Sequence, residues 1–278
     1  MKNYIAHLLK LGVSQTYRKN YYAMRQKCLQ HLSVVRQLQE LPRYTSASIT
    51  LLGETLDIVD SASCLSMYQD IFEREIYKFT AKGTQPFVID CGSNIGMSVI
   101  YIKRLYPESS VLAFESDPNV VSVLEKNIRS FKLSSVEIIP KAVWNAETTL
   151  EFLIEGADGG RLIDDQSDQS DSKLIQVKTV RLRDYLDRPI SFLKIDIEGA
   201  ETCVIEDCKD LLSNVENIFV EYHSFVGKPQ TLHVLLGCLI DAGFRVHLHA
   251  NAPIAQPFIQ RAIHTEMDMQ LNIFGFRE

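Results

Sequence analysis

Charged side chains interrupt or end two apolar runs of this sequence, and they are its best candidates for chemistry. The run LKIDIEGAE carries Lys194, Asp196 and Glu198 at alternate positions among Ile and Leu. Alternate residues of a strand point to the same side, and three charges there are costly to bury without partners. We expect them to reach the edge of a sheet where a ligand binds; a structural ion network is the alternative.

The run VEYH places Glu221 and His223 on one side of a second strand, which we expect to lie beside Asp196. An imidazole titrates near pH ~6.5 and can take a proton from a hydroxyl. The candidate catalytic residues are Asp196, His223 and Glu198, and the candidates for substrate contact are Glu221, Glu198 and Lys194. A purely structural His223 is the alternative. Two carboxylates with Glu221 could instead hold a divalent cation, but we predict no metal.

The segment FVIDCGSNIG ends an apolar strand in a turn that contains Asp90, Gly92, Asn94 and Gly96. Glycine permits positive φ and close approach of a ligand, and the following helix offers free N–H donors. A dinucleotide-binding fingerprint would be Gly-x-Gly-x-x-Gly, but its third position here is Asn94 and its sixth is Met97. The turn therefore favours a ligand without a pyrophosphate, with a structural turn as the alternative.

Two further positions fit a nucleoside. Glu115 ends the next predicted strand, 23 residues after Gly92, where an acid can accept hydrogen bonds from both ribose hydroxyls. A surface glutamate that caps the next helix would occupy the same position. Ala142, near the end of the third predicted strand, could line a slot for adenine, although packing alone would also explain it.

Strands and helices alternate from Pro86 onward. The predicted strands are 87–91, 111–115, 136–143, 191–197, 217–223, 244–249 and 271–276, and the predicted helices are 94–106, 117–131, 200–211 and 231–242. The last two strands are too close for a crossover helix and should be antiparallel. We predict an α/β fold with a doubly wound, mostly parallel seven-stranded sheet that ends in an antiparallel hairpin.

The first 80 residues lack this alternation. Helical spacing is found within 4–40 and 66–80, and two short strands are predicted within 48–60. We predict that residues 1–80 form an N-terminal helical and β cap, and that residues 81–278 form the main domain.

One stretch interrupts the main domain. Two strand-like runs, 149–154 and 174–180, flank an acidic segment with short side chains at 156–172. Such a composition predicts an exposed loop, and we treat the segment as an insertion.

Composition limits the class of protein. The 278 residues are 46% hydrophobic and 23% charged, and no apolar run reaches the ~20 residues of a membrane-spanning helix. Six cysteines without a Cys-x-x-Cys pair predict neither a disulfide framework nor a zinc ribbon, and the first residues lack a secretory cleavage site. We expect a cytoplasmic protein.

Charge is unevenly distributed. Residues 1–40 carry seven Lys or Arg and one acid, although the whole chain has a net charge of −6. This arm could contact an anionic surface or could be a solvated helix face, and a homodimer through the N-terminal helices is possible. Because the remainder is acidic, we expect no nucleic-acid partner.

These motifs together resemble the class I S-adenosylmethionine-dependent methyltransferases, and more narrowly the FkbM-type family, from about Ile71 to Phe244. The resemblance is carried by VIDCGSNIG, by Glu115 followed by Asp117 and Pro118, by LKIDIEGAE and by VEYH. It implies a Rossmann-like methyltransferase fold with S-adenosyl-L-methionine as cofactor and S-adenosyl-L-homocysteine as product.

The resemblance also implies roles for the site residues. The methionyl part would be bound by Asp90, Gly92, Asn94 and Gly96, and the ribose by Glu115, while the transferred methyl group would face Asp196, Glu198, and Glu221 or His223. The family is mostly associated with O-methylation of hydroxyls on sugars, glycans, polyketides and other secondary metabolites. We therefore expect a small-molecule or glycan acceptor, as in biosynthesis.

Two other functions fit parts of the pattern. An NAD-dependent oxidoreductase uses a similar sheet, although the glycine fingerprint is not met. A non-catalytic interaction module could retain the fold, although charges stand at every predicted strand end. Neither alternative is favoured.

Overall fold

A central sheet organises the computed structural model, which describes residues 15–154, 161–163, 173–251, 254–260, 262–263 and 267–277. Its seven strands lie in the order β12-β13-β11-β10-β3-β4-β5. Their bounds are β3 (Phe87–Cys91), β4 (Ser110–Phe114), β5 (Val136–Ile139), β10 (Phe192–Ile195), β11 (Asn217–Phe225), β12 (Arg245–Ala250) and β13 (Met267–Phe276). The strands from β5 to β11 are parallel, and β13 is antiparallel to both of its neighbours. The predicted mostly parallel sheet with a terminal antiparallel hairpin is confirmed.

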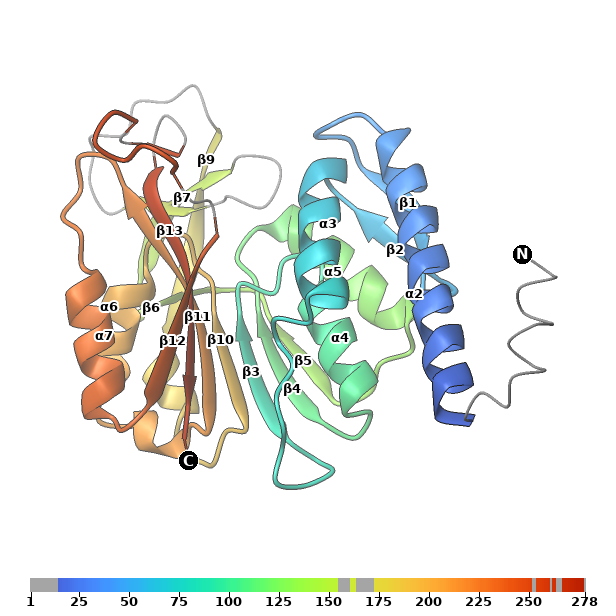
Figure 1. The fold of residues 1–278 in the computed structure, drawn as a ribbon. Helices are drawn as coiled ribbons and strands as arrows, with labels where there is room; N and C mark the ends of the chain where they lie inside the picture. Colours follow the sequence, from blue (N-terminus) through green and yellow to red (C-terminus); the bar gives the residue numbers. More distant parts are fainter. Residues whose placement is uncertain are drawn as a thin grey trace.

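Helices cover both faces of this sheet. One face carries α4 (Met97–Leu105) and α5 (Pro118–Ser130), and the other carries α6 (Glu201–Cys208) and α7 (Leu232–Asp241), as Figure 1 shows. Alternate strand residues supply two apolar layers: Val88 and Val111 pack with α4 and α5, whereas Ile89 and Leu193 pack with α6 and α7. The doubly wound arrangement is therefore observed.

The start of α5 shows how local sequence fixes an element. The Asp117 side chain accepts a hydrogen bond of 2.8 Å from the Asn119 amide, and Pro118 occupies the first helical position. Both are favourable at a helix N-terminus, and the sequence predicted both.

A smaller sheet corrects the predicted third strand. We predicted one strand over 136–143, but β5 ends at Ile139 and Ala142 begins a new strand. Pro140 lies between them; it has no N–H and cannot continue a ladder. The second sheet has the order β6-β9-β7-β8, with β6 (Ala142–Trp144), β7 (Thr149–Ile154), β8 (Arg161–Ile163) and β9 (Lys173–Arg181).

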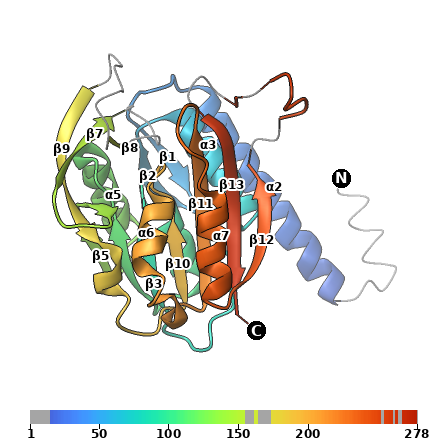
Figure 2. The same ribbon diagram turned by 90° about the vertical axis from the view of Figure 1, so that its left-hand side faces the viewer.

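The predicted insertion belongs to this smaller sheet. Its flanking strands β7 and β9 pair antiparallel, which Figure 2 shows at the margin of the molecule. We predicted a loop over 156–172, yet residues 161–163 form β8 on the edge of β7, because that edge offers free backbone partners. The rest of the predicted loop lies outside the described residues.

The N-terminal cap consists of α2 (Gln15–Gln39), the hairpin of β1 (Ala47–Leu51) and β2 (Glu54–Ile58), and α3 (Ser61–Tyr68), which continues as a π-helical turn to Glu73. The helix predicted over 66–80 is displaced, since it starts where Asp60 caps it and it ends at Glu73. Residues 4–14 of the helical segment predicted within 4–40 lie outside the described part.

The cap shares an apolar core with the main sheet. Val34 of α2, Leu56 of β2 and Tyr68 of α3 pack in the same buried cluster as Val99 of α4. The cap thus covers the helices on one face of the sheet (Figure 1). Among the described residues, no helix has the length and apolar character needed to cross a membrane.

Candidate functional site

The register of the sheet brings the charged residues of three strands together. Lys194 of β10 lies between Asp90 of β3 and Phe219 of β11, so that all three side chains share one face. Glu221 and His223 follow Phe219 at alternate positions on β11 and share that face. We call the following residues the charged cluster: Lys194, Asp196, Glu198, Glu201, Glu221 and His223.

We predicted Asp196 and Glu198 on the strand, and this prediction is wrong, because β10 ends at Ile195. They belong to the loop that leads into α6, where Glu198 adopts a positive φ of 53°. Asp196 is still hydrogen-bonded to the sheet, since its amide donates to the carbonyl of Cys91 at 3.1 Å. The loop brings both carboxylates to the carboxyl edge of the sheet.

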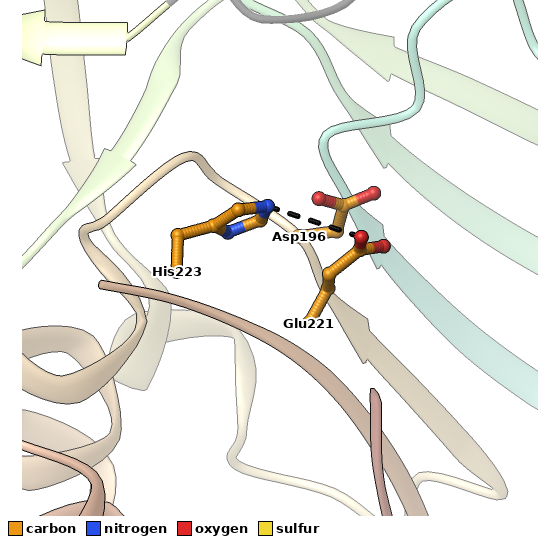
Figure 3. A group of neighbouring side chains, drawn as sticks. All are labelled: Asp196, Glu221 and His223. Carbon is orange, nitrogen blue, oxygen red and sulfur yellow. Dashed lines mark ion pairs between the residues drawn. The ribbon is translucent and has the colours of Figure 1, made fainter. Parts of the chain in front are cut away.

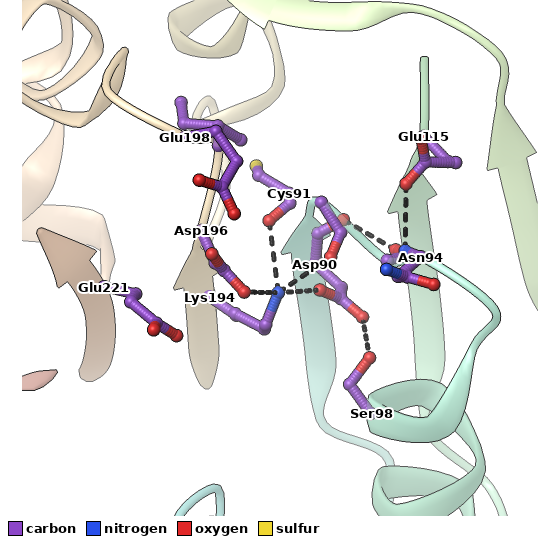
Figure 4. A network of polar contacts seen from close by, with 12 residues as sticks. Asp90, Cys91, Asn94, Ser98, Glu115, Lys194, Asp196, Glu198 and Glu221 are labelled. Atoms are coloured by element: carbon purple, nitrogen blue, oxygen red, sulfur yellow. Dashed lines mark hydrogen bonds and ion pairs between the residues drawn. The ribbon is translucent and has the colours of Figure 1, made fainter. Parts of the chain in front are cut away.

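Lys194 lies at the centre of this arrangement (Figure 4). Its ammonium is 3.3 Å from Asp90 and 3.2 Å from Asp196, and it donates to the carbonyls of Gly92 at 2.8 Å and Cys91 at 3.4 Å. Burial alone would lower the pKa of Lys194, but the Asp196 and Asp90 carboxylates hold it well above its ordinary value. With its ammonium enclosed by four oxygens, Lys194 is better suited to positioning than to contact with a substrate.

Asp90 has a similar positioning role. Its side chain is fully buried, and one of its oxygens accepts a hydrogen bond from the Ser98 hydroxyl of α4. It therefore ties the first turn to both α4 and Lys194.

The turn after β3 fits tightly against the loop after β10. Gly92 has a φ of +80°, and a Cβ placed on it would lie 1.9 Å from the backbone oxygen of Asp196. Only glycine fits there. Gly96, with a φ of 89°, precedes α4, and Asn94 has a φ of 46° with its side-chain oxygen accepting from the Ile95 amide at 2.6 Å.

Glu115 is held by three backbone amides at the end of β4. Its Oε2 accepts from Asn94 at 2.9 Å, and its Oε1 accepts from Ser116 at 2.8 Å and Asp117 at 2.9 Å. Burial raises the pKa of Glu115, and the three amides offset part of that effect. A carboxylate accepts about four hydrogen bonds, so about one position is left for a ligand rather than the two that bidentate ribose contact would need.

His223 is oriented by a residue that the sequence analysis missed. Its Nδ1 lies 2.9 Å from Oε1 of Glu201, whose carboxylate also accepts from the amides of Ile197 and Gly199. The imidazole is 1% exposed, and its Nε2 is 3.7 Å from Glu198 and 3.9 Å from Glu221. Glu201 could have been noticed from its place in the first turn of α6, where an acid is favourable.

Charge crowding decides the protonation of the cluster. Burial alone would lower the pKa of His223, but Glu198, Glu201 and Glu221 hold it well above its ordinary value. Burial raises the pKa of Glu198 to about 8, and burial together with Asp196 raises that of Glu221 to about 7. At neutral pH the metal-free cluster therefore keeps protons that these side chains would release in water.

Glu221 is fixed by one side chain of the antiparallel strand beside it and by one that follows β12. Its Oε1 accepts from Asn251 at 2.9 Å and from Gln270 of β13. These contacts depend on the register of β11 with β13, in which Gln270 lies opposite His223. No local pattern in the sequence signals such a pairing.

One predicted position lies apart from the cluster. Ala142 is buried with Phe152 and Val177 in the core of the smaller sheet, and its role beside adenine stays a prediction. His247 and His249 stand on exposed β12 with their Nε2 atoms 2.9 Å apart.

Comparison with known families identifies the chain. The sequence profile of the "Methyltransferase FkbM domain" matches residues 90–277. This chain belongs to that family. The matched part of this FkbM methyltransferase contains all the site residues described above, from Asp90 to Gln270. The match confirms the resemblance drawn from the sequence motifs.

Curated relatives carry matching names. The chain is 28% identical over 193 residues to "Methyltransferase 1" of Beauveria bassiana, covering 61% of this chain and 78% of that protein. It is 26% identical over 214 residues to "Methyltransferase sdnD" of Sordaria araneosa, covering 65% and 82%.

Matches to solved structures have low identity and low TM-scores. The methyltransferase FkbM of Methylobacillus flagellatus is 15% identical with a TM-score of 0.49, over 74% of this chain and 47% of that one, so this chain spans about half of its length. The TYW2 protein of M. jannaschii, solved in complex with AdoMet, is 15% identical with a TM-score of 0.43, over 86% and 89%.

Proposed function

We propose that this FkbM methyltransferase transfers the methyl group of S-adenosyl-L-methionine to a hydroxyl oxygen of a sugar, glycan or secondary metabolite. The observation that carries the proposal is the family match over residues 90–277, which contains the first turn, Glu115 and the whole charged cluster. The cofactor-binding candidates and the charged cluster thus both lie in the part of the chain that carries the family signature.

The residues of the first turn suit the cofactor. Glu115 keeps about one acceptor position free, which fits one ribose hydroxyl, and the glycine turn leaves backbone close to the start of α4 for the methionyl group. The cofactor supplies a methyl group on a positively charged sulfonium. The carboxylate of Asp196 lies at the adjacent edge, and negative charge there favours binding of that cation.

The proton acceptor follows from the protonation of the cluster. With its pKa held high, His223 is an imidazolium in the metal-free protein and is a poor base. Glu198 and Glu221, with pKa values of about 8 and about 7, are matched to accept a proton near neutral pH. We assign proton transfer to this carboxylate pair. The role of His223 is to orient Glu198 and Glu221.

The step balances without another reactant. The hydroxyl oxygen forms a bond to the methyl carbon, the carbon–sulfur bond breaks, and its electron pair stays on sulfur, giving S-adenosyl-L-homocysteine. The hydroxyl proton goes to the carboxylate pair. Holding both reactants in line is worth about 7–11 kcal/mol at best, and the base adds about 10²–10⁴ in rate.

A direct comparison of ligands separates this function from an oxidoreductase. S-adenosyl-L-homocysteine should raise the melting temperature of the full chain, whereas NAD should leave it unchanged. Formation of S-adenosyl-L-homocysteine should then increase with a hydroxylated acceptor drawn from a panel of sugars, glycans and phenolic or polyketide alcohols. Stabilisation by NAD alone would reverse the assignment, and cofactor binding without turnover on any acceptor would support a non-catalytic module. A cytoplasmic location and a homodimer through the N-terminal helices stay predictions.

A further inference from the structure

We propose that Asp196, Glu221 and His223 form a binding site for one divalent cation. Each residue offers one ligand atom, and the three atoms lie within 4.8 Å of one another. Figure 3 shows the three side chains directed toward a common point from β11 and the loop after β10. The site itself does not depend on methyl transfer; only its use in catalysis rests on the proposed function.

Each of the three side chains is held by a second group that leaves a ligand atom available. Lys194 lies 3.2 Å from Oδ2 of Asp196, Asn251 and Gln270 donate to Oε1 of Glu221, and Glu201 binds Nδ1 of His223. Among the described residues, Oδ1 of Asp196 and Oε2 of Glu221 have no hydrogen-bond partner. Protein metal sites orient their ligands in this way, with a carboxylate on the far nitrogen of the histidine.

The Nε2 atom of His223 points independently to a missing ligand. The ring is 1% exposed, and the oxygens of Glu198 and Glu221 at 3.7 and 3.9 Å are too far from Nε2 to accept a hydrogen bond. The nearest polar partner is the Gln270 amide nitrogen at 3.4 Å, which can only donate. A proton on Nε2 therefore has no acceptor within hydrogen-bond distance, and a cation in its place would face two carboxylates.

The surrounding charge favours a cation. Five carboxylates, those of Asp90, Asp196, Glu198, Glu201 and Glu221, face the ammonium of Lys194 and the imidazole. A divalent ion would offset the excess negative charge at the point where the three ligand atoms converge.

The donor set indicates the class of ion. One imidazole nitrogen with two carboxylate oxygens suits Mn²⁺, Fe²⁺ or Zn²⁺ better than Ca²⁺. Ligand atoms about 2.1 Å from a tetrahedral ion lie about 3.4 Å apart, so the side chains would close by up to about 1.4 Å. The carboxylates of Asp196 and Glu221, which are 24% and 14% exposed, lie at the solvent edge and can make that movement.

A cation with three protein ligands keeps positions for water or substrate. Under the proposed function, an acceptor hydroxyl bound there would lose its proton more easily. With Glu221 on the ion, Glu198 would be the member of the carboxylate pair that accepts that proton.

Manganese binding by the full chain tests the site. Protein freed of metal with a chelator should bind one Mn²⁺, seen as loss of the free-ion signal in electron paramagnetic resonance. The Asp196→Asn and Glu221→Gln variants, which preserve shape, should bind at least about tenfold more weakly. Melting curves without metal would show that both variants are folded.

The exposed pair His247–His249 provides a matched control, since it is another place among the described residues where two metal-ligating side chains meet. The double variant His247→Ala/His249→Ala should bind Mn²⁺ as the unchanged protein does. Absence of binding, equal binding by Asp196→Asn and Glu221→Gln, or loss of binding in the double histidine variant would overturn the proposal.

Calorimetry with S-adenosyl-L-methionine on the metal-free protein keeps the two hypotheses apart. Cofactor binding without Mn²⁺ binding would remove only the cation site. Mn²⁺ binding without cofactor binding would remove the proposed function and leave the cation site standing.

Discussion

The carboxylate of Asp60, in the N-terminal cap, and that of Glu198, at the edge of the main sheet, are both largely enclosed by protein, yet their surroundings differ. Asp60 accepts hydrogen bonds from Arg43 at 2.8 and 3.0 Å, from the Tyr44 amide at 2.7 Å and from Ser63 at 2.9 and 3.0 Å. Among the described residues Glu198 has no hydrogen bond, and its nearest charged partner is His223 at 3.7 Å.

The pKa values follow from this difference. Burial would raise the pKa of Asp60, but Arg43 and the backbone amides more than offset it, so that the pKa lies below its ordinary value. Burial raises that of Glu198 to about 8, and the nearby His223 offsets only part of the effect. A carboxylate with all its acceptor positions filled supports the fold, whereas one with unfilled positions is prepared for a ligand or a proton.

The largest expected effect compares one glycine of each region. Gly92 and Gly53 have similar φ angles of +80° and +89°, but a Cβ on Gly53 would meet nothing within 4 Å. We expect Gly53→Ala to cost about 1–2 kcal/mol of unfolding free energy from backbone strain alone. Gly92→Ala should cost at least about 4 kcal/mol or prevent folding, because it also collides with Asp196. Equal losses in urea unfolding would show that the turn and the loop do not meet as described.

Glu198→Gln should separate activity from stability. Turnover should fall by about 10²–10⁴ because the proton acceptor is lost. The free energy of unfolding at pH 8 should stay the same or rise by up to about 2 kcal/mol, because a poorly compensated charge is removed. Full turnover, or a clear loss of stability, would place Glu198 with the structural carboxylates instead.

Asp60→Ala should have the opposite effect. It removes a helix cap and the hydrogen bonds that Asp60 accepts from Arg43 and two backbone amides, so we expect a loss of about 2–4 kcal/mol of unfolding free energy. Asp187, an exposed carboxylate paired with Arg188, provides the control, and Asp187→Ala should change stability by less than about 0.5 kcal/mol. Cofactor affinity of the folded Asp60→Ala protein should be unchanged; if it fell, the cap would take part in the site.

The pH dependence of stability sharpens the same contrast with a smaller effect. In the metal-free protein the pKa values of Glu198, Glu221 and His223 are all raised. The other charged groups that face them are Asp196, Glu201 and Lys194. A raised pKa means that the folded state holds more protons, so the contribution is present below the ordinary values of ~4.3 and ~6.5 and is lost as pH rises.

Unfolding free energy measured with a chelator should therefore fall between about pH 5 and pH 9, by at least about 2 kcal/mol. Glu198→Gln should flatten that fall. The contribution of Asp60, whose pKa is lowered, is present above ~3.9 and is lost only as pH falls below that value. A stability that rises from pH 5 to 9 would contradict the protonation described for the cluster.

The sequence was sufficient for elements with strong local signals. The strand and turn at FVIDCGSNIG, the Asp117–Pro118 helix start and the closing hairpin are all present, because periodicity, capping and loop length act locally. It failed where neighbouring residues compete: Pro140 divides one predicted strand between two sheets, and Asp60 moves the start of α3 to Ser61.

Prediction of the site had the same limit. Asp90, Lys194, Asp196, Glu221 and His223 do converge, since the carboxyl ends of parallel strands share one edge. The partners that orient them, Glu201 and Gln270, come from a helix start and an antiparallel strand distant in the sequence, and only the folded register brings them in. The three backbone amides that donate hydrogen bonds to Glu115 are likewise placed beside it only by the folded loop.

Binding of S-adenosyl-L-methionine by calorimetry tests the central claim most directly, that the strand ends of the main sheet form a methyl-donor site. The unchanged protein should bind the cofactor with one site per chain. Glu115→Ala should bind at least about tenfold more weakly through the loss of a charged hydrogen bond, and exposed Glu108→Ala should bind normally. No heat of binding to the unchanged protein, or equal affinity for Glu115→Ala, would contradict the account.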